Sequence, residues 1–158
     1  MMSRITRRAA WSALVGAGIA AGAVACTPDQ TPPGPPTGLS IKELMERVID
    51  PPADLFWEAS GTIITAAGET SRAPTTDAGW QAAVNAAATL VEAGNLLMMP
   101  GRARDDKEWM QYARQLQRTA TAGMKAAQAR DERAVFDAGG EIFLACRSCH
   151  MKYLLGYQ

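Results

Sequence analysis

Three side chains with strong binding chemistry stand close together near the end of the printed sequence. Cys146, Cys149 and His150 form the pattern C-x-x-C-H. Residues at positions i, i+3 and i+4 of an α-helix lie on the same face. A helix through this segment therefore points two thiols and an imidazole at one neighbour. This spacing constrains the fold strongly, because the other elements must leave room beside that helix face for whatever the three groups bind.

The C-x-x-C-H pattern is the attachment site of a c-type haem, in which both thiols bond the porphyrin and the imidazole binds the iron. Two other interpretations share the cysteine pair. A zinc site needs further ligands, but His150 is the only histidine and the third cysteine, Cys26, is distant. A thioredoxin-like pair belongs in a βαβ context, and none is visible. The motif therefore predicts one covalent haem c on Cys146 and Cys149, with His150 as an iron ligand.

Residues 1–25 have the composition of an export signal. Arg4, Arg7 and Arg8 precede an apolar stretch rich in Gly and Ala that lacks Asp, Glu and Lys. The stretch is short for a membrane-spanning helix, which needs about 20 strongly apolar residues. We therefore expect a cleaved signal peptide, with a retained membrane anchor as the alternative.

Cys26 follows Ala23-Val24-Ala25, and this segment resembles a bacterial lipobox, although Ala23 stands where Leu is usual. Lipidation explains an otherwise unpaired thiol in an exported protein. The alternative is ordinary cleavage that leaves Cys26 as a free thiol. We predict a signal peptide of lipoprotein type, lipidation of Cys26, and a periplasmic protein anchored by its lipid to a membrane of a Gram-negative bacterium.

Residues 26–38 should form an extended tether, because five prolines and two glycines lie between residues 27 and 38 and such a run excludes helix and paired strand. Without the three arginines of the leader, 13 basic residues remain against 16 acidic ones, a formal charge of about −3. This charge gives no sign of a nucleic-acid partner.

Four helical segments are expected in residues 39–158. The first begins with a capping box of Ser40 and Glu43, breaks or kinks sharply at Asp50-Pro51-Pro52, and resumes through Ile63-Ile64 before a loop from Gly68 to Thr76. Apolar spacing of three and four residues predicts the others, which run from Asp77 to Met99, from near Asp105, and from near Asp131.

No strand pattern is apparent, so the expected fold class is all-α, an antiparallel up-down four-helix bundle with the haem on its last helix. Gly139-Gly140 interrupts that helix at a cost of roughly 1 kcal/mol per glycine. Either a neighbouring helix approaches closely there, or the pair leaves room for the haem.

A haem motif on the last helix of such a bundle resembles the class II c-type cytochromes, the cytochrome c′ and cytochrome c556 family. The resemblance covers residues 39–158 and is most specific at Cys146-x-x-Cys149-His150-x-x-Tyr153. It implies that His150 is the proximal iron ligand and that the first helix covers the distal face. It also implies that Tyr153 contacts the haem or hydrogen-bonds near it.

Met45, on the inward stripe of the first helix, is the candidate distal ligand, because family members with six-coordinate iron use a methionine there. In five-coordinate members an apolar side chain only blocks that position, and core packing is the common use of a methionine. Met98, Met99, Met110, Met124 and Met151 are alternatives, of which Met151 is excluded from the opposite face by its place beside His150.

The family often places an arginine for a haem propionate where this chain has Ile41, and Lys42 or Arg47 could replace it. Trp57, Trp80 and Trp109 are pocket or core residues. Arg147 and Lys152 are either a basic rim for an acidic redox partner or a solvated helix face.

The resemblance implies a periplasmic electron carrier, not an enzyme, which transfers single electrons between redox partner proteins and can form a homodimer. The alternative is a five-coordinate protein that binds nitric oxide or carbon monoxide. A thiol-redox or purely structural lipoprotein without haem is the third class.

Overall fold

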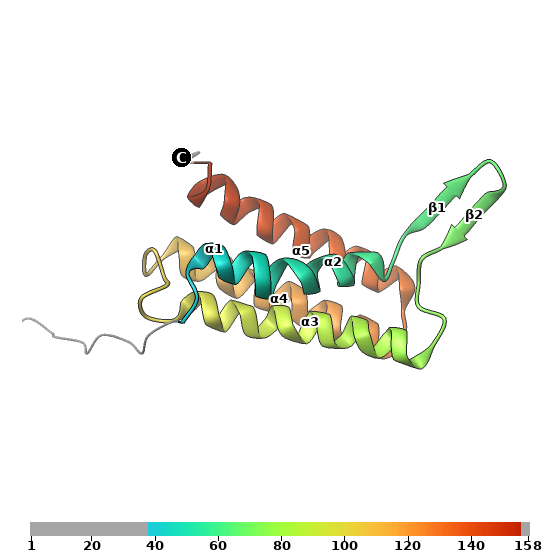
Figure 1. Cartoon of the computed structure of the whole chain (residues 1–158), viewed down its shortest axis with the longest axis horizontal. Helices are drawn as coiled ribbons and strands as arrows, with labels where there is room; N and C mark the ends of the chain where they lie inside the picture. The colour runs from blue at the N-terminus through green and yellow to red at the C-terminus, as the bar shows by residue number, and fades with distance from the viewer. Residues whose placement is uncertain (1–37, 156–158) are drawn as a thin grey trace, which may run out of the picture. The chain divides into compact units, whose positions relative to one another are not determined.

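The computed structural model describes residues 38–155 and consists mostly of helices. The first helical segment comprises α1 (Ile41–Leu44), the π-helical turn η1 (Met45–Ile49) and α2 (Asp50–Glu58). A hairpin of β1 (Thr62–Thr65) and β2 (Gly68–Ser71) follows. Three helices of 22 residues complete the chain: α3 (Asp77–Met98), α4 (Glu108–Ala129) and α5 (Glu132–Tyr153). These helices pack side by side as a helical bundle (Figure 1).

The starts of the helices agree with the capping signals in the sequence. The Ser40 hydroxyl accepts the Glu43 amide at 3.2 Å, and the Glu43 carboxylate accepts the Ser40 amide at 3.0 Å. The Asp131 side chain caps α5 by accepting the amide of Ala134 at 3.0 Å. Asp105 lies three residues before α4, but its carboxylate accepts the amide of Trp109 in the first turn. Side chains that accept the free amides of a first turn stabilise a helix start there.

The predicted break at Asp50-Pro51-Pro52 is wrong. Asp50 has helical torsion angles (φ −60°, ψ −48°), and the helical backbone continues through both prolines. The irregularity precedes them: in η1 the Asp50 amide donates to the carbonyl of Met45, five residues back. Prolines have no amide hydrogen and are tolerated where a helical hydrogen-bond pattern begins anew. A π-turn followed at once by α2 supplies such a position.

The prediction of no strand, and of a helix resuming through Ile63-Ile64, is also wrong. α2 ends at Glu58, and Thr62 to Thr65 pair antiparallel with Gly68 to Ser71, Thr62 opposite Ser71. Gly61 (φ +95°) stops the helix with a backbone conformation that other residues rarely adopt. The four residues of β1 are all β-branched and favour extended structure. The hairpin is solvent-exposed and projects away from the helices (Figure 1).

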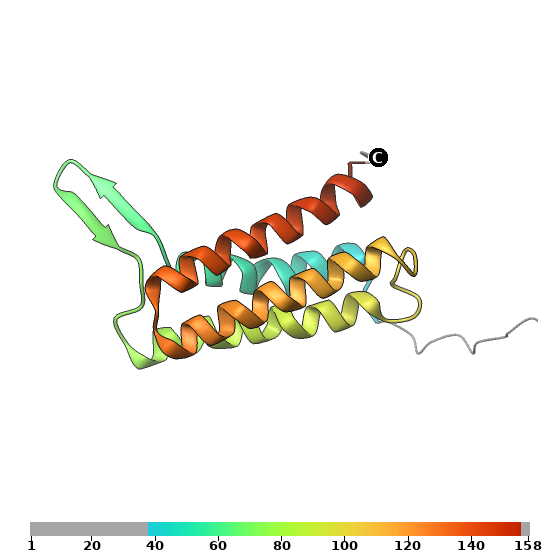
Figure 2. The same cartoon turned by 180° about the vertical axis from the view of Figure 1, so that it is seen from behind.

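The core lies between the helices and combines a few large apolar side chains with many alanines. Phe56, Leu44, Leu90, Ile142 and Val135 are the largest fully buried side chains. α5 crosses the α1–α2 segment at an angle, so its C-terminal end lies farther from that segment than its N-terminal end does (Figures 1 and 2).

Gly139 and Gly140 have different surroundings. A Cβ on Gly139 would lie 3.2 Å from Cδ1 of Trp57, whose indole nitrogen also donates to the Gly139 carbonyl at 2.9 Å. A Cβ on Gly140 would meet nothing within 4 Å. Of the two interpretations of this pair, the close approach of a neighbouring helix therefore holds at Gly139.

A buried aromatic side chain, Phe56, makes a similar close contact at Gly123 of α4. A Cβ on Gly123 would lie 2.6 Å from Cζ of Phe56, whose side chain is fully buried. We expect Gly123→Ala to lower the free energy of unfolding by about 1–3 kcal/mol, the usual cost of overpacking. The matched change Gly140→Ala should raise it by about 0.5–1 kcal/mol, because alanine costs less backbone entropy in a helix. Urea unfolding of both variants measures the two values, and equal signs would contradict the packing argument.

Candidate cofactor site

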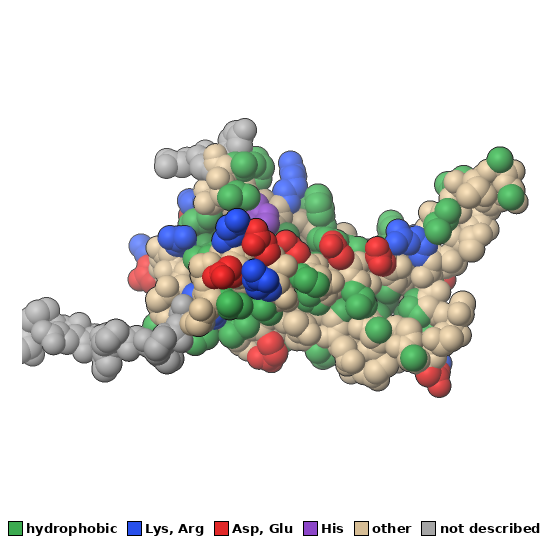
Figure 3. Space-filling model, in the orientation of Figure 1, with side chains coloured by type: hydrophobic (Ala, Val, Ile, Leu, Met, Phe, Trp, Pro, Cys, Tyr) green, Lys and Arg blue, Asp and Glu red, His purple; other side chains and the backbone are tan. Residues whose placement is uncertain are grey.

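A cavity of about 340 Å³ lies between the first helical segment and the C-terminal half of α5. α4 and the end of α3 complete its lining, which is mainly apolar and includes Ile49, Ala53, Trp57, Leu97, Trp109, Ala113, Leu116 and Phe143. Ligand and cofactor sites are concave and largely apolar, with volumes from about 300 Å³ upward. The cavity is open to the outside, where the chain's histidine is visible between the two helical segments (Figure 3).

The three residues of the C-x-x-C-H pattern all line this cavity. Cys146, Cys149 and His150 lie within α5 and are each half-buried. The predicted single helix face is therefore observed, and it faces the cavity. Because α5 continues one turn past the second cysteine, the imidazole of His150 is held on regular helix.

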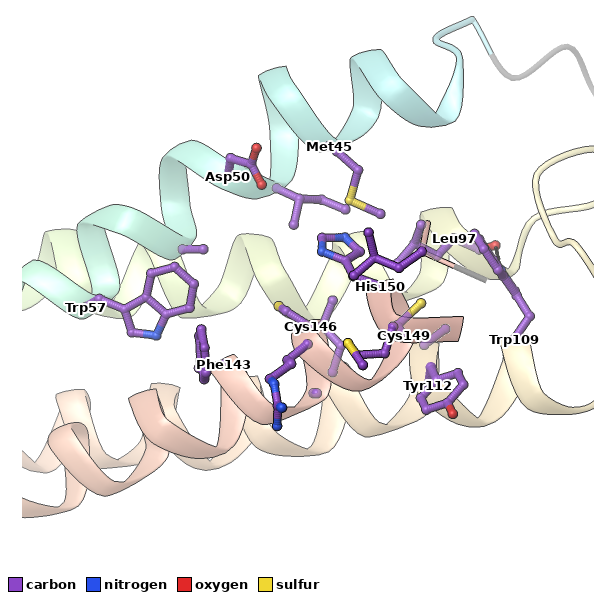
Figure 4. A pocket seen from close by; sticks show the side chains of 18 residues that line it. Met45, Asp50, Trp57, Leu97, Trp109, Tyr112, Phe143, Cys146, Cys149 and His150 are labelled. Atoms are coloured by element: carbon purple, nitrogen blue, oxygen red, sulfur yellow. Dashed lines mark hydrogen bonds between the residues drawn. The ribbon is translucent and has the colours of Figure 1, made fainter. Parts of the chain in front are cut away.

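Met45 lies on the opposite wall of the cavity, in η1. Its thioether points across the cavity toward the His150 imidazole, with both cysteines beyond that ring (Figure 4). Of the other methionine candidates only Met151 lines the cavity, and it belongs to the same helix as His150. The structure thus leaves Met45 as the methionine that faces His150 from a different helical segment.

Both thiols are disfavoured as thiolates. Burial, and secondarily the charge of Asp50, raises the pKa of Cys146, and burial followed by the neighbouring Cys146 raises the pKa of Cys149 to about 11. Reactive cysteines of thiol oxidoreductases have lowered pKa values. The pKa values of Cys146 and Cys149 are raised instead, which disfavours the thiol-redox interpretation. Within residues 38–155, no three His, Cys, Asp or Glu side chains gather as a metal-binding group.

Tyr153 does not line the cavity but supports one of its walls from behind. Its ring meets the rings of Trp109 and Tyr112 edge-on, at centroid distances of 5.0 and 6.1 Å, and both of those residues line the cavity. Its hydroxyl donates to Asp105 in the loop before α4. One residue earlier, Lys152 forms an ion pair with Glu108 at the start of α4. These contacts fasten the last turn of α5, and with it His150, to the beginning of α4.

The remaining candidates divide between cavity and surface. Trp57 and Trp109 line the cavity, and Trp80 does not. Ile41, Lys42 and Arg47 also lie outside its lining, and Lys42 pairs with Glu46 at 3.4 Å. Of the two proposed rim cations, Arg147 lines the cavity. Lys152 does not, and its ammonium group forms an ion pair with Glu108.

Asp50 and Phe143 line the cavity as well, although no sequence motif marks them as site residues. In the sequence, Asp50 is only the residue before a proline, and Phe143 is an apolar residue three positions before Cys146. The four-residue spacing of Ile49, Ala53 and Trp57 indicates that this segment places one helical face toward a neighbour. Asp50 lies next to that face in the sequence.

The leader, Cys26 and all but the last residue of the tether lie outside the described residues. Among residues 38–155, no helix combines the length and hydropathy needed to cross a lipid bilayer.

No protein-family model, no curated protein and no solved structure matches this chain. A functional assignment therefore rests on the residues of the chain and on the geometry of this cavity.

The hydrogen bond from Tyr153 to Asp105 should contribute to stability in a pH-dependent way. It is the main cause that lowers the pKa of Asp105 below its usual value. A carboxyl group whose pKa is lowered by folding stabilises the folded state at a pH above its pKa in the unfolded chain, about 3.9. This contribution is lost as the pH falls through the pKa of the same group in the folded state. We expect the free energy of unfolding to fall less steeply below about pH 4 in Tyr153→Phe than in the unmodified protein.

Urea titrations between pH 2 and 7, a range that brackets the usual carboxyl pKa, measure this difference. The control is Tyr112→Phe, which removes a hydroxyl from the adjacent ring and leaves the bond to Asp105 in place. Parallel acid profiles for all three proteins would contradict the assignment.

Proposed function

We propose that this chain is a c-type cytochrome of the class II kind, in which an antiparallel up-down four-helix bundle carries one covalent haem. The observation that supports this most strongly is the set of groups on the cavity walls. Two thiols and an imidazole come from α5, and a thioether faces them from η1 (Figure 4). A thioether is a soft ligand found on haem iron, and imidazole is the common proximal ligand.

The residues around the cavity fit such a group in both chemistry and position. Cys146 and Cys149 would hold it covalently, and His150 would bind the iron from the α5 side. Met45 would bind from the η1 side, and apolar lining side chains such as Leu116 and Trp57 would exclude water from the group. When bound, a haem supplies one-electron oxidation and reduction. A methionine ligand and an apolar surround both favour a high reduction potential.

With His150 and Met45 both bound to the iron, the protein would leave no coordination position for a substrate. We therefore assign single-electron transfer, not catalysis. The assignment includes export, lipidation at Cys26, a periplasmic location and redox partner proteins, all as proposals.

The pyridine haemochrome assay on full-length protein, produced with a haem-attachment system, tests the assignment. We expect one haem per chain, and a low-spin ferric spectrum with a sulfur-to-iron charge-transfer band. A coloured, high-spin protein whose reduced form binds carbon monoxide would establish the five-coordinate alternative. Colourless protein would reject the cytochrome assignment altogether.

A further inference from the structure

The π-helical turn η1 changes which side chains of the first helical segment face the cavity. Ile49, Ala53 and Trp57 line the cavity at four-residue intervals. In a regular α-helix each residue turns by about 100°, so position 46 would lie about 20° from the direction of Ala53, and position 45 about 80° away. Regular geometry would therefore present Glu46 to the cavity.

The observed arrangement is different. Met45 lines the cavity, whereas Glu46 is exposed and pairs with Lys42 on the outer surface. A π-turn contains one residue more than an α-turn, so it rotates every earlier residue by about 100°. This rotation moves Met45 to the direction that Glu46 would otherwise occupy.

We propose that η1 positions Met45 as the distal ligand by this rotation, which replaces a carboxylate with a thioether on the cavity face. The inference rests on the proposed haem function and concerns the same site. The rotation also explains the exposed position of Lys42 and Glu46, four residues apart on the outer surface. Pro51 and Pro52 at the start of α2 are compatible with this change of register, because neither has an amide hydrogen that could form an α-helical bond back into η1.

The hydrogen bond that closes η1 suggests a direct test. The Asp50 amide donates to the Met45 carbonyl across five residues. Deletion of Arg47, an exposed residue outside the cavity, lets the same two groups form an ordinary α-helical bond across four residues. Met45 then keeps its direction, and we expect the deletion protein to retain the low-spin spectrum and the sulfur-to-iron band at full intensity.

The matched control is deletion of Asp54, another exposed charged residue of the same segment. It lies in regular helix between the cavity residues Ala53 and Trp57, so its loss rotates Met45 by about 100° relative to Trp57. We expect this protein to lose the sulfur-to-iron band and become high-spin. Circular dichroism and thermal unfolding establish that both deletion proteins are folded.

A substitution that changes no chain length gives a second test. Met45→Ala combined with Glu46→Met moves the thioether by one position. With η1 in place, position 46 faces outward, so the double variant should stay high-spin like Met45→Ala alone. Restoration of the low-spin spectrum by Glu46→Met would overturn the inference, as would a high-spin Arg47 deletion that remains folded. A high-spin unmodified protein would instead refute Met45 ligation itself, and colourless protein would refute the haem assignment.

Discussion

Protein in which Cys146 and Cys149 are both replaced by serine will release all of its haem into acidified organic solvent, whereas the unmodified protein will retain it. The expected effect is complete, because each thioether bond requires a thiol and serine hydroxyls do not add to the vinyl groups. Both side chains are half-buried on one face of α5, and serine occupies nearly the same volume. The fold should therefore persist while covalent attachment is lost.

The single variants Cys146→Ser and Cys149→Ser serve as intermediate cases, each with one remaining bond. Denaturing electrophoresis stained for haem peroxidase activity measures retention by each protein. Ser148→Ala is a suitable control on the same helix, since Ser148 is exposed and its hydroxyl donates only to the Leu144 carbonyl, at 2.7 Å. Covalent haem in the double serine variant would refute the attachment site.

Met45→Leu should convert a low-spin, six-coordinate iron into a high-spin, five-coordinate one. Leucine keeps most of the volume of methionine, so the cost in stability should stay below about 1.5 kcal/mol, but it removes the only sulfur that faces His150 from another helical segment within residues 38–155. We expect loss of the sulfur-to-iron band, binding of carbon monoxide by the reduced form, and a lower reduction potential, because a methionine ligand raises it.

The matched control for this change is Met151→Leu. Met151 also lines the cavity but extends from the same helix as His150, so its replacement should leave the spectrum low-spin. Absorption spectra of the ferric and reduced proteins, with and without carbon monoxide, distinguish the two variants. If Met45→Leu keeps the unmodified spectrum, Met45 is not the ligand.

Much of the helical architecture was predictable from local signals. Capping residues place the starts of α1 and α5, and the apolar spacing of Asp77–Met98 agrees with the predicted helix. Local signals were insufficient where two of them conflicted. Pro51 and Pro52 disfavour a helix, but a π-turn before them resolves the conflict. The apolar pair Ile63-Ile64 fits a continued helix, but it lies in a run of four β-branched residues, Thr62 to Thr65, whose stiff side chains favour a strand.

The sequence by itself determined that Cys146, Cys149 and His150 share one face of a helix, because that depends only on helical periodicity. Tertiary structure decided what stands opposite them. The direction of Met45 depends on the hydrogen-bond register of η1, on the prolines that follow it, and on packing of η1 against α3. Rotation of a helix about its own axis is set by the sum of such contacts, and the residues of one segment do not specify it. The tertiary structure therefore determines the second wall of the cavity, and with it the position of Met45 opposite His150.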